Sequence, residues 1–173
     1  RALQQTVAIV GYQHGVVDHT SKDLIGRRDN PDYRDNTSHY FYVGADENFT
    51  PTLNGAVRVG AQYVEYPNVD HYVPGGLDDN TWSPYADASL TWTYAERCTL
   101  QGGIKHQHSQ TDIISLDVEA TSLYATLSHA ITAKLTGSLL ATYQHAVFNQ
   151  GTWDTLADDF FTVGANMAYQ INT

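Results

Sequence analysis

The feature that most constrains this chain is its rhythm of half-alternating segments, each about a dozen residues long. Short connections of about four residues and long ones of about ten to twenty join these segments in turn. Antiparallel strands whose two hairpin ends lie in different environments have this pattern. It predicts an all-β, antiparallel, up-and-down barrel with strands at residues 4–17, 37–49, 54–66, 82–94, 99–109, 121–131, 136–148 and 159–171.

The alternation is clearest in residues 82–94. A period of two indicates a strand whose two faces lie in different surroundings. One face of this segment carries Ala86, Ala88, Leu90, Trp92 and Tyr94, and the other carries Tyr85, Asp87, Ser89, Thr91 and Thr93. In the first segment, however, Ala8, Val10 and Tyr12 compete with Val7 and Ile9 for the apolar face, so its phase stays open.

Hydropathy excludes a transmembrane helix but not a membrane barrel. The mean hydropathy is -0.37, and no run of 18 apolar residues occurs. Barrel strands expose apolar side chains only at alternate positions, so such a protein keeps the mean hydropathy of a soluble one.

The composition agrees with strands at a membrane. The 12 Tyr, 3 Trp and 5 Phe suit pleated surfaces and membrane interfaces. The formal net charge is -10, and the sequence has no cluster of basic residues of the kind that binds nucleic acid.

The two faces of the strands suggest a lipid-facing side and a lumen-facing side. Aromatic residues near the ends of the apolar face fit two interfacial girdles, and we assign Tyr63, Trp92, Tyr94, Tyr143 and Tyr169 to them. The opposite face is polar, and we assign Asp46, Arg58, Gln62, Asp87 and Lys105 to the lining of a pore. A soluble ligand-binding barrel is the mirror alternative, with its apolar face inside.

Several ordered segments resemble a family of bacterial outer-membrane porins, the beta-barrel porin 2 type. They are SHYFYVGADENFTPTLNGAVRVGAQYVEY, WSPYADASLTWTYAE, TSLYATLSHAITAKLTGSLLATYQHAVFN and DDFFTVGANMAYQIN, and together they cover nearly the whole chain. The resemblance implies the outer membrane of a Gram-negative bacterium, long loops facing outward and passage of small hydrophilic solutes or ions by diffusion. It supplies no catalytic residues.

The extent of the chain predicts one domain over residues 1–173, either a barrel or a contiguous part of one. The sequence stops at Ile171, Asn172 and Thr173, where the next short turn is expected, so we expect a larger barrel. If the eight strands close on themselves instead, the interior is narrow and filled by side chains. A non-conducting barrel with a structural or adhesive role is therefore another alternative, and the sequence leaves oligomerisation open.

Motifs for chemistry are absent from the sequence. It has no GxSxG, P-loop, HExxH or CxxC motif, so we predict neither an enzyme nor a cofactor. His106 and His108 share a face and could begin a metal site, but no Cys or carboxylate stands at ligand spacing in that segment, so we predict no metal there. The acidic long connections are a second place where divalent cations could bind, although ordinary solvated loops explain them equally well.

Overall fold

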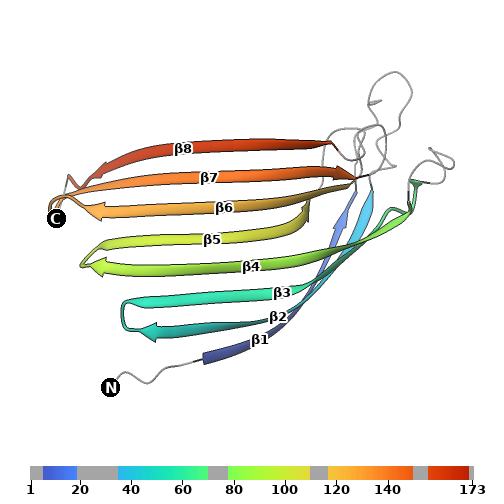
Figure 1. The fold of residues 1–173 in the computed structure, drawn as a ribbon, viewed down its shortest axis with the longest axis horizontal. Helices are drawn as coiled ribbons and strands as arrows, with labels where there is room; N and C mark the ends of the chain where they lie inside the picture. The colour runs from blue at the N-terminus through green and yellow to red at the C-terminus, as the bar shows by residue number, and fades with distance from the viewer. Residues whose placement is uncertain (1–5, 19–34, 70–77, 110–116, 150–155, 172–173) are drawn as a thin grey trace.

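The computed structural model describes residues 6–18, 35–69, 78–109, 117–149 and 156–171, and the elements whose bounds lie within these ranges are all β-strands (Figure 1). Among these residues, no helix has the length and apolar character needed to cross a bilayer. The strands are β1 (Thr6–Val17), β2 (Asn36–Thr50), β3 (Leu53–Glu65), β4 (Asn80–Ala95), β5 (Cys98–Ser109), β6 (Asp117–Ala130), β7 (Leu135–Asn149) and β8 (Ala157–Tyr169).

The strands form one antiparallel sheet in the order in which they occur along the chain. The short connections, at residues 51–52, 96–97 and 131–134, all lie at one end of the strands, which we call the turn end. We call the opposite end the loop end. The predicted all-β, up-and-down architecture is therefore confirmed. Within the described residues β1 and β8 each pair with a single neighbour, so the sheet is open.

Several strands extend beyond the bounds predicted from the sequence. The largest difference is in β6, where the sequence pattern predicts a long connection over residues 117–120. These residues continue the ladder, because Val118 pairs with Phe148 and Ala120 pairs with Ala146. The partner strand supplies backbone hydrogen bonds that a single-strand pattern cannot reveal. For the same reason the turns at residues 51–52 and 96–97 are tighter than the predicted four residues.

Pairing with β2 settles the phase of β1. Val10 lies opposite Val43, and Tyr12 lies opposite Phe41. Directly opposed residues of an antiparallel pair point to the same side of the sheet. The even-numbered residues of β1 therefore join the apolar face.

The apolar face is exposed in this structure. Val59 is 50% exposed, Leu90 48% and Val163 64%. By contrast, the polar face is covered near the loop end, where Ser38, Gln62 and Ser83 are buried. The only buried apolar cluster among the described residues is small and lies at that same end, built from Val64, Tyr66 and Val69. A single sheet has no second layer on which to bury its apolar side.

The sheet is strongly curved. In Figure 1, β1, β2 and β3 sweep upward at the loop end while β5 to β8 run almost horizontally. Tyr42 on β2 and Tyr85 on β4 contact each other across β3, with ring centroids 6.0 Å apart. Both tyrosines are register partners of Gly60, which belongs to the polar face of β3. Register partners point to the same side of the sheet, so the two tyrosines also belong to the polar face. Together with its burial near the loop end, this contact identifies the polar face as the inner, concave side.

Candidate functional site: the polar face of the curved sheet

Three charged residues lie side by side across the middle of the polar face. Arg58 of β3 pairs in register with Asp87 of β4, and Asp87 pairs with Lys105 of β5. The row continues through Ser122 and Gln144 on the next two strands. Register partners on one face lie about 5 Å apart at Cβ, so the charges alternate in sign at close range.

Asp46 adds a second negative charge, and we include it in the charged row because it lies two residues along β2 from Gly44, the register partner of Arg58. Its carboxylate accepts a hydrogen bond from Arg58 Nη2 at 3.1 Å. The Arg58 side chain runs over Gly44, where a Cβ atom would stand 2.8 Å from Arg58 Cγ. Both partners keep substantial solvent exposure, 28% for Arg58 and 44% for Asp46. An ion pair this exposed contributes little to stability, so its main effect is on the local electrostatic potential.

Gln62 occupies a different environment from the four charged residues. It lies on the same face but is only 2% exposed, toward the loop end. Its Nε2 donates a hydrogen bond to the Tyr40 hydroxyl at 2.6 Å. Its register partner Ser83 is also buried, and neither Gln62 Oε1 nor Ser83 Oγ has a hydrogen-bond partner among the described residues.

Tyrosines form a second component of the polar face that sequence reasoning did not include in the predicted lining. Tyr42 covers Gly11 of the neighbouring strand, and Tyr124 covers Gly103. Added Cβ atoms at Gly11 and Gly103 would lie 2.1 Å and 2.5 Å from the respective tyrosine side chains. An aromatic ring laid over a cross-strand glycine is a known means of fixing strand register. The feature that would have identified these tyrosines is a Tyr directly opposite a Gly on the neighbouring strand, and only the register reveals it.

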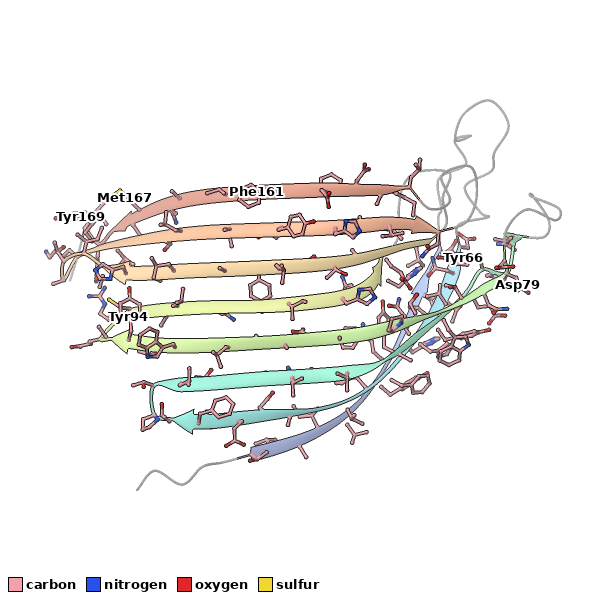
Figure 2. The ribbon with its side chains drawn as sticks, viewed as in Figure 1. Tyr66, Asp79, Tyr94, Phe161, Met167 and Tyr169 are labelled. Atoms are coloured by element: carbon pink, nitrogen blue, oxygen red, sulfur yellow. The ribbon has the colours of Figure 1, made fainter. Side chains whose placement is uncertain are left out.

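The residues that the sequence assigns to aromatic girdles lie on the apolar face, and all except Tyr143 are near the ends of their strands. At the loop end, Tyr63 contacts Trp82 with ring centroids 4.9 Å apart. Tyr143 lies near the middle of β7, where its hydroxyl donates a hydrogen bond to Asp159 at 2.8 Å. At the turn end, Trp92 contacts Tyr94 at 5.6 Å. Figure 2 shows Tyr94 and Tyr169 at this end and Tyr66 at the other.

The aromatic group at the loop end also contains residues that the sequence analysis does not assign to a girdle. Tyr12 and Phe41 contact each other at 5.0 Å and continue the loop-end group onto β1 and β2. Trp82 and Trp92 are ten residues apart on β4. At about 3.3 Å per residue they are separated by about 33 Å along the strand, or about 25 Å along a barrel axis if the strands tilt by about 40°. That height matches the apolar band of an outer-membrane barrel.

His106 and His108, which the sequence analysis considers as a possible start of a metal site, have different hydrogen-bond partners. His106 Nδ1 is 2.8 Å from Thr121 Oγ1, whereas His108 is buried and lies 3.3 Å from the Tyr66 hydroxyl through Nε2. No group of three or more His, Cys, Asp or Glu side chains suited to a metal occurs in the described ranges. Most of the acidic long connections, at 19–34, 70–77, 110–116 and 150–155, lie outside the described residues.

A curved meander with one exposed apolar face, two aromatic groups and a charged inner face defines a protein of the β-barrel class. The family model described as "Putative beta-barrel porin 2" matches residues 8–173, and the chain belongs to this family. No curated protein and no solved structure matched the chain. The suspected family is therefore confirmed.

Proposed function

We propose that this chain forms a bacterial outer-membrane porin, or a contiguous part of one, through which small hydrophilic solutes diffuse passively. The observation that carries the proposal is the opposition of the two faces. One face is apolar, exposed and bounded by aromatic residues about 25 Å apart, and the other bears the charged row. A soluble ligand-binding barrel would require the reverse arrangement, with the apolar side chains on the inside.

The charged row gives the proposed lumen its electrostatic character. Arg58 and Lys105 supply two positive charges, and Asp46 and Asp87 supply two negative ones, so the row is balanced. A row with equal numbers of positive and negative charges excludes neither cations nor anions. This fits a general diffusion channel better than an ion-specific one. Eight strands alone would enclose a lumen filled by side chains, so we place this function in a barrel with more strands.

Single-channel recording in a planar lipid bilayer tests the proposal. The full-length protein, folded in detergent and inserted, should show discrete conductance steps with weak ion preference. A folded, inserted protein that never conducts would contradict the porin function and favour a non-conducting structural barrel. Heat-modifiable gel mobility is the independent check that the protein has folded as a membrane barrel.

Charge variants of the row should shift ion preference in opposite directions. D46N/D87N should move the reversal potential toward anion preference, and R58Q/K105Q toward cation preference. We expect each removed charge to change the permeability ratio about two- to fivefold, the effect of a unit charge at a few ångströms in a water-like medium. Glu47→Gln is the matched control, because Glu47 follows Asp46 on the same strand but belongs to the opposite face, where it contacts Thr6. If D46N/D87N, R58Q/K105Q and Glu47→Gln all shifted the reversal potential equally, the charged row would not line the conducting path.

A further inference from the structure

Two histidines far apart in the sequence lie opposite each other at the loop end of the apolar face. His14 of β1 is the register partner of His39 of β2, and their ring centroids are 4.8 Å apart. His14 is exposed and His39 is half-buried. Their proximity depends on the β1 to β2 pairing, so the sequence alone does not reveal it.

The separation of the two rings suits shared coordination of one metal ion. An imidazole nitrogen binds such an ion at about 2.1 Å, which places the ring centre about 3.2 Å from the metal. Two rings at that distance, with a ligand angle of about 90° to 110°, have centres about 4.5 to 5.2 Å apart. The observed 4.8 Å falls within this range.

Tyr12 contacts His39 and holds the orientation of its ring. Its hydroxyl oxygen lies 2.9 Å from His39 Nδ1, and the two rings are stacked at 21°. Ligating histidines usually donate their second ring N–H to an acceptor, which fixes the tautomer and the ring orientation. If Nδ1 carries the proton and donates it to Tyr12, the lone pair of His39 lies on Nε2 and is available to a metal.

We propose that His14 and His39 form a two-histidine binding site for a divalent transition-metal ion, with Tyr12 as a positioning residue and water completing the coordination. Imidazole favours Cu²⁺, Ni²⁺ and Zn²⁺ over Mg²⁺ and Ca²⁺. Binding needs no redox step, because each nitrogen lone pair forms a coordinate bond. The site joins β1, an outer strand of the open sheet, to β2.

His129 provides a matched control within the same chain. It also lies on the apolar face, and the Tyr94 hydroxyl is 2.8 Å from its Nδ1, with the rings stacked at 10°. Its register partner on β7 is Gly137 rather than a second histidine. The control therefore keeps the Tyr–His pair and lacks the opposed imidazole. All variants would carry Cys98→Ser, which removes the nearby thiol as a competing ligand.

The test is titration of the folded, detergent-solubilised protein with Cu²⁺ and Zn²⁺, without a polyhistidine tag. Calorimetry gives the affinity, and electron paramagnetic resonance of the Cu²⁺ form reports the number of nitrogen ligands. We expect H14Q and H39Q each to weaken the tightest site at least tenfold and to remove one nitrogen. Y12F should weaken it about tenfold while keeping both nitrogens, since loss of such an outer partner typically costs 10- to 100-fold. H129Q should leave affinity and spectrum unchanged.

Two results would overturn the proposal. One is the absence of saturable Cu²⁺ or Zn²⁺ binding by the folded parent. The other is binding that survives unchanged in H14Q and H39Q, which would place the metal at other histidines. Zn²⁺ should also raise the thermal midpoint of the parent but not of H14Q, because a ligand that binds only the folded state stabilises it. Channel conductance is not a readout here, so the metal site can fail while the porin function stands.

Discussion

Val59→Arg is expected to destabilise the folded protein in a lipid bilayer by about 2–4 kcal/mol, the cost of a basic side chain at the midplane of a barrel's lipid face. Val59 lies on the exposed apolar face near the middle of β3, between the two aromatic groups. Urea unfolding in phospholipid vesicles, followed by the fluorescence of the protein's tryptophans, would measure the change in the free energy of unfolding.

Ala56→Arg is the control for this prediction. Ala56 belongs to the same strand but points to the polar face, where its register partners are Asp46 and Ser89. An arginine there has a carboxylate within reach, and we expect a change below about 1 kcal/mol. Equal destabilisation by the two substitutions, or a greater effect of Ala56→Arg, would refute the proposed orientation of the sheet in the membrane.

Gly60→Ala is the second substitution with a large expected effect. A Cβ atom at this position would lie 1.9 Å from the carbonyl oxygen of Phe41 and 2.7 Å from the Cα of Tyr42. Both are backbone atoms, so relief of the clash requires β2 and β3 to separate and the Tyr42–Tyr85 contact to shift. We expect a loss of about 3 kcal/mol or more, at the upper end for overpacking. Refolding yield and the unfolding midpoint would report the loss.

Gly102→Ala controls for the general effect of replacing a strand glycine. A Cβ atom added there would meet its nearest neighbour, the carbonyl oxygen of Tyr124, at 3.6 Å, an ordinary contact distance. This substitution should be neutral or stabilise the protein by about 0.5 kcal/mol, since alanine restricts the unfolded chain. If Gly60→Ala behaved the same way, the close approach of β2 and β3 at Gly60 would be wrong.

Local patterns were sufficient to predict most of the fold. In residues 82–94 the period of two separates Leu90 and Trp92 from Asp87 and Thr91 without reference to any other strand. The alternation of short and long connections then predicts the strand order, because adjacent segments must run in opposite directions. The phase of β1 could not be predicted in this way, since Val7 and Ile9 are as apolar as Ala8 and Val10. It depends on pairing with Val43 and Phe41.

The arrangement of the candidate site required the register. Sequence alone assigned Arg58, Asp87 and Lys105 to the polar face, but it could not show that they occupy one row. Register follows from where each tight turn falls, and a slip of one residue would reverse the faces of a whole strand. The proximity of His14 and His39 and the ring of Tyr42 over Gly11 have the same long-range origin. The assignment of the five polar residues to a pore lining stays a prediction.

The strictly sequential strand order has a consequence for how the sheet assembles. Each described strand pairs only with its neighbours along the chain, so every ladder among the described residues joins two consecutive strands. Pairing of consecutive strands closes a shorter stretch of chain than pairing of strands further apart in the sequence, so less loop-closure entropy is lost. Hairpins joined by the short turns at residues 51–52, 96–97 and 131–134 can therefore form first and then associate side by side. We expect each such hairpin to act as a cooperative folding unit.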